Sequence, residues 1–469
     1  MRRSLRLPTL FTALLASCAT AAAAPPIILD NARVFDGERD LGITTLTLRD
    51  ERIAHIGPPP PALAKGAKRI DYQGKVILPG LVSNHIHVGN TDGLEHGDRF
   101  YTRDHVLRDL QQFQRYGITT VTALGMNGAA FTTVTALGMN GAAFTTIRAE
   151  VRDQPTLGAQ LYGAGGGIGA AAGAPPAKTM GLEHDPVARP TTPDQARAAV
   201  RAQQQAGVDV IKLWVDDLGG RFPMMAPPIY RAAIDEAHRH QLKVAAHIHD
   251  QAPAADLVEA GVDIIAHGIR DTPVAPALVS AMRDKGVWYI PTVNIDEANY
   301  LYAENPQWLQ QPFVANALPA AVRERWQQPQ WQKAQLAGDG IPKARAAVAM
   351  NLRNLKTLHE AGVNIGFGTD AGAMPQRVIG VAEHRELELM TQAGFTPAQA
   401  LQVATADAAR LLGLDDRGRI AVGRRADLLV LGANPLEDIR NSRRIDAVWQ
   451  AGQQVAGPIE AEAGTAARD

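Results

Sequence analysis

Two histidines separated by one residue, His85 and His87, follow an apolar run from Val76 to Val82. Side chains at positions i and i+2 of a β-strand lie on the same face of the strand. The pattern therefore predicts two imidazole rings directed to one point, an arrangement that suits a borderline metal ion such as zinc. Such a pair also arises by coincidence or through packing, so its meaning depends on the rest of the chain.

Further polar residues lie in or directly after short apolar, strand-like runs: Lys212, His247, His267 and Asp370. Lys212 is the most informative, because burying an ammonium group without a partner is costly and burial lowers the pKa of a lysine. A neutral amine can react with carbon dioxide to form a carbamate, an anionic ligand able to bridge two metal ions. The alternative is a lysine that extends to solvent or pairs with Asp216 or Asp217.

The elements that must position these residues form a regular alternation. Strands are expected near residues 77–83, 119–124, 159–164, 208–215, 243–248, 262–267, 287–292 and 364–369. Helices are expected over residues 103–115, 194–206, 228–240, 252–260, 275–285, 342–361, 381–393 and 397–412. Eight strands alternating with helices predict an α/β fold, a (β/α)8 TIM barrel, in which chemistry lies at the C-terminal ends of the strands.

Short strands with turn signals also occupy both flanks of this region. Neither flank has enough strands to bury a core alone, so we expect both to join in a small β-sandwich domain. The expected division is 1–24 signal peptide, 25–76 first sandwich part, 77–414 metal-dependent barrel, 415–458 second sandwich part and 459–469 flexible tail. The long segment 293–345 is expected to be a lid or wall of the pocket, or a surface insertion.

The N-terminus has the features of a targeting segment. Arg2, Arg3 and Arg6 precede an apolar stretch and then small residues through Ala24, which predicts export to the periplasm or secretion. The stretch is too short for a permanent membrane span. Cleavage before Pro25 is one expectation; a lipoprotein anchored at Cys18, the sole cysteine, is the alternative. The formal net charge of −1 argues against a nucleic-acid partner.

Residues 119–131 are repeated without change as residues 132–144. Two copies of so short a period do not make a solenoid. A tandem duplication spanning the second strand and the following loop is one explanation, and a sequencing artefact is the other. The barrel has room for one second strand, and residues 116–118 lead directly into the first copy. We therefore expect the first copy to form the strand.

The set formed by residues 79–81, His85, His87, Lys212, His247, His267, Asp370 and residues 418–428 resembles the amidohydrolase superfamily in its binuclear form. The surroundings of Lys212, His247 and His267 are similar to its peptidase and imidazolonepropionase-like branch, whose lysine is carboxylated. The resemblance implies that His85, His87 and Asp370 bind one metal ion and that His247 and His267 bind the second. It implies that Lys212, N6-carboxylated by carbon dioxide, bridges two divalent ions, with Zn²⁺ expected.

That resemblance implies a hydrolase that cleaves the C–N bond of an amide or peptide-like small molecule with a metal-bridging hydroxide. Asp370 would be the catalytic base, which takes the hydroxide proton and passes it to the leaving amine. Hydrolysis of an ester, lactone or carbamate is an alternative on the same site, and an inactive exported binding protein is an alternative of another class. A homo-oligomer is expected.

Three residues are candidates for substrate binding. His249 shares a face with His247 and either contacts substrate or packs, and Arg270 either clamps a carboxylate or pairs with Asp271 or Asp217. Tyr230 either lines the pocket or has a packing role. Many members of the family carry aspartate where this chain has Ser83, so the support of His85 is expected to differ here.

Overall fold

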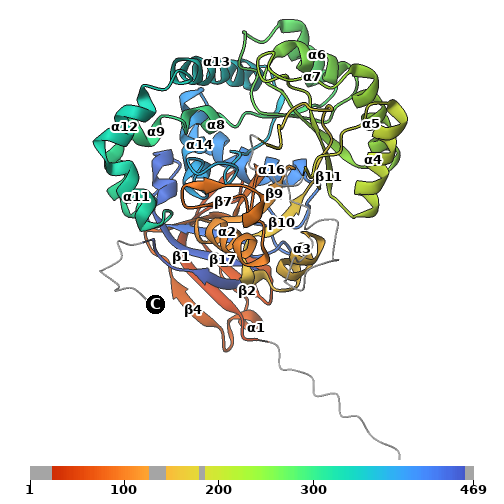
Figure 1. Cartoon of the computed structure of the whole chain (residues 1–469). Coiled ribbons are helices and arrows are strands. Elements are labelled where there is room, and N and C mark those ends of the chain that lie inside the picture. Colours follow the sequence, from red (N-terminus) through yellow and green to blue (C-terminus); the bar gives the residue numbers. More distant parts are fainter. Residues whose placement is uncertain (1–23, 126–143, 179–184, 460–469) are drawn as a thin grey trace, which may run out of the picture.

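The computed structural model describes residues 24–125, 144–178 and 185–459. It consists of a ring of parallel strands enclosed by helices and a smaller β domain beside it (Figure 1). The ring strands are β6 (Leu81–Ile86), β9 (Ile118–Ala123), β10 (Gln160–Gly163), β11 (Val210–Trp214), β12 (Lys243–His247), β13 (Ile264–Ala266), β14 (Trp288–Ile290) and β15 (Asn364–Ile365). Each agrees in position with one of the eight predicted strands, and all their ladders are parallel.

The ring closes through backbone contacts at two places where regular ladders stop. Between β10 and β11, Ile168 forms a parallel bridge with Leu213, and its N–H donates to the Lys212 carbonyl at 2.8 Å. Between β15 and β6, Ile86 bridges Ala371, and the His87 N–H donates to the Ala371 carbonyl at 2.7 Å. The predicted barrel is therefore present, and both closures lie beside candidate ligands.

Helices cover the outside of the ring (Figure 1). They are α2 (Arg103–Arg115), α3 (Phe144–Asp153), α4 (Pro193–Gln205), α5 (Pro227–Arg239), α6 (Gln251–Glu259), α7 (Pro276–Asp284), α13 (Ile341–Glu360) and α14 (Val381–Gln392), followed by α15 (Pro397–Gln402) and α16 (Ala408–Leu411). Thr102, Thr192 and Thr396 begin α2, α4 and α15 by accepting a hydrogen bond from a backbone N–H in the first turn. Helix α3 was not expected, and a π-helical segment, Val403–Asp407, divides the helix predicted over 397–412.

The small domain is built from both flanks of the chain, as predicted, and its eight strands belong to one hydrogen-bonded sheet. Its strands are β1 (Ile27–Phe35), β2 (Asp40–Arg49), β3 (Arg52–Ile56), β4 (Lys68–Asp71), β5 (Val76–Pro79), β16 (Leu428–Leu431), β17 (Ile445–Gln450) and β18 (Gln453–Ala456). In β16, Leu428 and Val430 join the domain's own hydrophobic cluster, whereas Leu429 and Leu431 join the main cluster of the barrel. Because successive side chains of a strand point to opposite faces, β16 packs against both cores.

The strand predicted over residues 77–83 is divided at Gly80. Val76–Pro79 pairs with β1 and β16 of the small domain, and Leu81–Ile86 pairs with β9 of the barrel, so the small domain extends past the predicted limit at residue 76. A Cβ atom at Gly80 would lie 2.3 Å from Oγ1 of Thr119. The absence of a side chain therefore lets the chain cross from one sheet to the other.

The first copy of the repeat forms β9, which confirms that expectation, while residues 126–143, with nearly all of the second copy, lie outside the described residues. The predicted lid or insertion contains short helices, among them α8 (Asn294–Glu297), α9 (Leu301–Glu304), α10 (Pro312–Ala315), α11 (Ala320–Gln327) and α12 (Pro329–Leu336). Two of its residues, Ile295 and Asp296, line the cavity described below. In the described part of the chain, no helix is both long and apolar enough to cross a membrane.

Candidate metal centre

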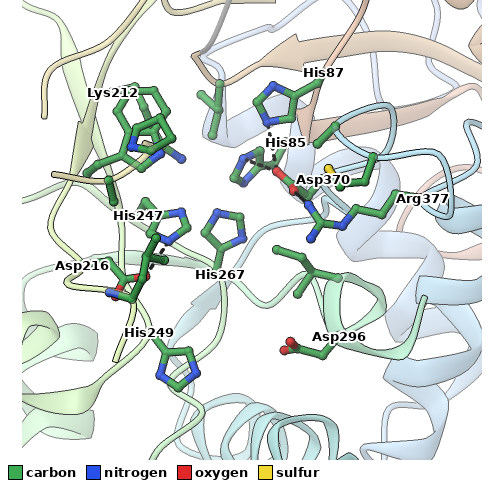
Figure 2. Close-up of a pocket in the computed structure, with 18 of the residues that line it drawn as sticks. His85, His87, Lys212, Asp216, His247, His249, His267, Asp296, Asp370 and Arg377 are labelled. Atoms are coloured by element: carbon green, nitrogen blue, oxygen red, sulfur yellow. Dashed lines mark hydrogen bonds and ion pairs between the residues drawn. The ribbon is translucent and has the colours of Figure 1, made fainter. Parts of the chain in front are cut away.

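All six predicted ligands line one cavity of about 410 Å³ at the C-terminal ends of the barrel strands. Lys212 lies in β11, His247 ends β12, and His267 follows β13 directly. His85 lies in β6, His87 follows that strand, and Asp370 lies beyond β15. Figure 2 shows Lys212 and His247 on one side, His87 and Asp370 on the other, and His267 between them. The convergence expected from strand ends is therefore observed.

His85, His87 and Asp370 form the tightest part of the cluster. Their candidate ligand atoms all lie within 4.8 Å of one another. Nε2 of His85 lies 3.1 Å and Nε2 of His87 lies 3.0 Å from the same oxygen, Oδ1 of Asp370. Two imidazoles and one carboxylate meeting at one point are a donor set that suits a divalent ion such as Zn²⁺.

His247 and His267 form the second part. The ring centroids of His247 and His267 are 4.3 Å apart, and those of His267 and His85 are 4.5 Å apart, so His267 connects the two parts. Nε2 of His247 lies 2.9 Å from Oδ2 of Asp216, and Nδ1 of His267 lies 3.0 Å from Oγ1 of Thr292. Each of these contacts engages one ring nitrogen and leaves the other for a metal ion.

Burial keeps these imidazoles neutral. It lowers the pKa of His85 to about 3, with a further contribution from the charge of Lys212. Burial also lowers the pKa of His247, and it lowers that of His267 well below the ordinary value. A histidine must be deprotonated to bind a metal ion, so these neutral rings can bind one without first losing a proton.

Lys212 is almost fully buried, with 1% of its surface exposed. Its Nζ atom has no hydrogen-bond partner among the described residues, so the proposed pairing with Asp216 or Asp217 is not formed. Burial lowers the pKa of Lys212 to about 7, against a smaller opposing effect of Asp370. A large fraction of this amine is therefore neutral at neutral pH, as carbamate formation requires.

Asp370 is also buried, and burial alone would raise its pKa. The neighbouring charges of Arg377 and His87 and the hydrogen bonds from His85 and His87 lower it instead, well below its usual range. Arg377 contacts Oδ2 of Asp370 directly, as Figure 2 shows. The carboxylate is therefore ionised, as a metal ligand must be.

Three residues of the centre have left-handed backbone conformations that are uncommon outside glycine. The φ angles are 72° at His267, 61° at Asp370 and 42° at Thr292. Such conformations carry a cost and are maintained only when the surroundings hold them in place. The strain lies at one proposed ligand of each metal ion and at the hydroxyl that contacts His267.

The three candidate substrate-binding residues have different positions. His249 lines the cavity, and its Nδ1 lies 2.6 Å from Oδ1 of Asp250. Arg270 also lines it but pairs with Asp296 at 2.9 Å, not with Asp271 or Asp217. Tyr230 is buried in the hydrophobic core on α5 and is not among the residues that line the cavity.

Three residues that contact the proposed ligands were not identified from the sequence. These are Arg377, Thr292 and Asp216, which contact Asp370, His267 and His247, respectively. Asp216 lies two residues beyond β11, at the same strand-end position that identified the ligands, so that signal was available. Arg377 and Thr292 lie in turns without any pattern. Ser83 does not replace the aspartate common in the family, because its buried Oγ has no hydrogen-bond partner among the described residues.

The residues present fit a pair of divalent metal ions. The donors include the neutral imidazoles of His85, His247 and His267 and the ionised carboxylate of Asp370. A buried amine without a hydrogen-bond partner, Lys212, lies beside them. An ammonium group left there would be an unpaired buried charge, which is costly. A carbamate on Lys212 would remove that cost, because it replaces the buried positive charge by an anion that bound metal ions stabilise.

A family model described as the amidohydrolase family matches residues 76–455. The chain is 27% identical over 278 residues to ochratoxinase of Aspergillus niger. The aligned region covers 56% of this chain and 50% of ochratoxinase. It is 29% identical over 252 residues to an uncharacterized protein of Mycobacterium tuberculosis, covering 51% and 56% of the two chains. The chain thus spans about half the length of the curated relatives it matches.

Solved structures resemble the whole described fold. A Xaa-Pro dipeptidase with bound methionine has a TM-score of 0.70 at 23% identity, covering 92% of this chain and 99% of that one. A putative prolidase from Bifidobacterium longum has a TM-score of 0.67 at 26% identity, covering 92% and 95%. The crystal structure of A. niger ochratoxinase has a TM-score of 0.69 at 22% identity, covering 93% and 96%.

Proposed function

Because this chain belongs to the amidohydrolase family, we propose that it is an exported, metal-dependent hydrolase that cleaves the C–N bond of an amide or peptide-like small molecule. One observation carries the proposal. Six residues of metal-binding or carbamate-forming type, from the ends of five strands, line a single cavity, and the amine among them is buried without a hydrogen-bond partner. Xaa-Pro dipeptidase and prolidase structures with the same fold support the choice of bond.

We assign the residues as follows. His85, His87 and Asp370 would hold one ion and His247 and His267 the other, with a carboxylated Lys212 as a further anionic ligand; zinc is the ion that this donor set favours. In the carboxylation, a bond forms between Nζ of Lys212 and the carbon of CO₂, and the amine releases a proton. Two bound ions supply a water molecule of lowered pKa and a polarised carbonyl group.

The chain's own groups provide the remaining chemistry. Asp370 accepts the proton of the attacking water and delivers it to the leaving amine, because its carboxylate is fixed between His85, His87 and Arg377. Asp216 and Thr292 orient His247 and His267. Apolar side chains of Leu124, Trp214, Leu218, Ile295 and Met374 line the cavity and exclude water from the substrate.

His249 and Arg270 line the same cavity and are the proposed contacts to the polar end of the substrate. Export rests on the basic and apolar N-terminal residues alone, and the lipid anchor at Cys18 and a homo-oligomeric state are subsidiary proposals. Each has a direct measurement: the N-terminal mass of the mature protein for the first two, and light scattering for the third.

The function is tested with purified protein by metal analysis and a matched panel of substrates. We expect about two equivalents of zinc per chain and hydrolysis of N-acyl amino acids or dipeptides. The panel contains esters, lactones and carbamates with the same acyl groups. Faster turnover of these would favour the alternative bond class, and tight metal binding without turnover of any member would favour a binding protein.

A further inference from the structure

Two buried carboxylates lie one turn apart on α14, outside the set of proposed ligands. Glu383 and Glu386 have no exposed surface. Among the described residues, neither forms an ion pair, in contrast to Glu388 on the same helix, which pairs with Arg385 and Arg443. A buried carboxyl group without a cation depends on hydrogen bonds to offset the cost of its burial, so what these two groups hold in place is informative.

Glu383 holds the turn that carries Asp370. Its Oε1 accepts a hydrogen bond of 2.6 Å from the hydroxyl of Thr369, and its Oε2 accepts one of 2.9 Å from the N–H of Gly380. The same hydroxyl oxygen accepts the N–H of Ala371 at 3.1 Å. Glu383 therefore fixes both neighbours of Asp370, whose φ angle of 61° needs support from its surroundings.

Glu386 holds a second turn, on the side of the other metal ion. Its two oxygens accept the N–H groups of Val293 and Asn294, at 2.8 and 2.9 Å. These residues directly follow Thr292, whose φ angle is 42° and whose Oγ1 lies 3.0 Å from Nδ1 of His267. Glu386 thereby fixes the turn that orients His267.

We propose that α14 is a brace for the binuclear centre: Glu383 positions Asp370 at the first metal ion, and Glu386, through Thr292, positions His267 at the second. Both are positioning residues, because neither touches the cavity. A single rigid helix thus fixes one ligand of each ion, which sets the relation between the two ions. This inference rests on the metal centre of the proposed function.

The test measures zinc affinity of the purified full chain by competition with a chelating indicator, with the melting temperature measured in parallel. Glu386→Ala is expected to lower the affinity for one of the two zinc ions by about 10- to 100-fold, the usual effect of losing a residue that supports a metal ligand. Glu383→Ala is expected to lower the affinity for the other. Glu386→Gln, which keeps an acceptor oxygen, is expected to fall between Glu386→Ala and the wild type.

Glu388→Ala is the matched control, since it removes a buried carboxylate from the same helix that contacts neither turn. It is expected to lower the melting temperature and to leave both zinc affinities unchanged. Thr292→Val is expected to weaken the same equivalent as Glu386→Ala, and the double variant should lose less than the sum of the two effects.

The brace is overturned if Glu386→Ala and Glu386→Gln lower the melting temperature as Glu388→Ala does while both zinc equivalents keep wild-type affinity. It is also overturned if the wild type binds no zinc. A wild type that binds two zinc ions and hydrolyses no amide refutes the proposed function but leaves the brace standing, because the brace is read from metal affinity.

Discussion

At the residue scale, Lys212 is the residue that we propose to join the two halves of the centre. Its amine is buried, has no hydrogen-bond partner among the described residues and has a pKa lowered to about 7. Lysine is otherwise a poor choice for such a position, because the interior does not solvate its charge. The proposed carbamate would account for a lysine at this position, which packing alone does not explain.

Lys212→Ala should abolish hydrolysis and reduce the bound metal, because the bridging anion is lost. Short carboxylic acids should restore part of the activity by supplying two oxygens in its place. The measurement is turnover with and without added acetate or propionate, with Lys356→Ala, an exposed lysine paired with Glu360, as the control. Full activity of Lys212→Ala without any added acid would refute the bridge.

Asp370→Asn should lower kcat by about 10²- to 10⁴-fold, the usual contribution of a positioned acid or base, with a smaller effect on KM. The amide cannot accept the proton, although it keeps the shape of the side chain. Steady-state kinetics on the best substrate of the panel would measure this. Asp296→Asn is the control in the same cavity, because its carboxylate pairs with Arg270 and contacts no proposed ligand. Equal losses in both variants would show that Asp370 has no special role in proton transfer.

At the element scale, the helix α14 should give the protein's stability a recognisable pH dependence. Burial raises the pKa of Glu386 from 4.5 to about 8; the hydrogen bonds from Asn294 and Val293 oppose this, and the charges of Glu297 and Glu383 add to it. The folded state therefore keeps a proton that the unfolded state releases. This contribution to stability is complete below about pH 4.5 and is lost as the pH rises through about 8.

Glu386→Gln cannot titrate, so its melting temperature should fall less than that of the wild type between about pH 5 and about pH 9. The gap should reach about 1 °C or more at the alkaline end, because about 1 kcal/mol shifts the melting temperature of a chain of 469 residues by about 1 °C. Calorimetry of the metal-loaded protein measures it. Parallel curves for the two proteins would show that Glu386 does not carry this dependence.

The repeated segment is also an element-scale feature. The first copy supplies β9, and the chain leaves that strand at the cavity, which Leu124 lines. Deleting residues 132–144 should therefore leave a folded barrel that binds metal but has a changed preference across the substrate panel. Circular dichroism, metal analysis and relative turnover measure these properties. Unfolding, or an unchanged preference, would contradict this explanation of the extra copy.

At the scale of the whole molecule, the two domains are joined where β5 passes into β6 at Gly80. A Cβ atom there would lie 2.3 Å from Oγ1 and 2.6 Å from Cγ2 of Thr119 in β9, so Gly80→Ala must displace the side chain of Thr119. We expect it to lower the free energy of unfolding by about 1–3 kcal/mol, as overpacking usually does. Denaturant titration measures this.

Gly340→Ala is the control for that prediction. Gly340 has a φ angle of −76°, and a Cβ atom at this position would meet no atom within 4 Å. It should change the free energy of unfolding by far less. If the two variants unfolded alike, the junction at Gly80 would not be the close contact that its geometry indicates.

The sequence alone determined the barrel, the two-part small domain and the six residues that converge. The reason is that hydrophobic periodicity is local, and the direction of a strand fixes where its C-terminal end lies. His85, His87 and Lys212 could therefore be assigned to one mouth before any contact was known. Their roles as metal ligands, however, could be assigned only through the resemblance to a known family.

Only the tertiary structure decided which groups support those residues. Arg377 beside Asp370, Thr292 beside His267 and Glu386 behind Thr292 lie in turns or on a helix far apart in sequence, and no period relates them. It also removed Tyr230 from the cavity and gave Arg270 the partner Asp296. Side-chain contacts of this kind depend on how helices and loops pack around the ring, which local patterns do not encode.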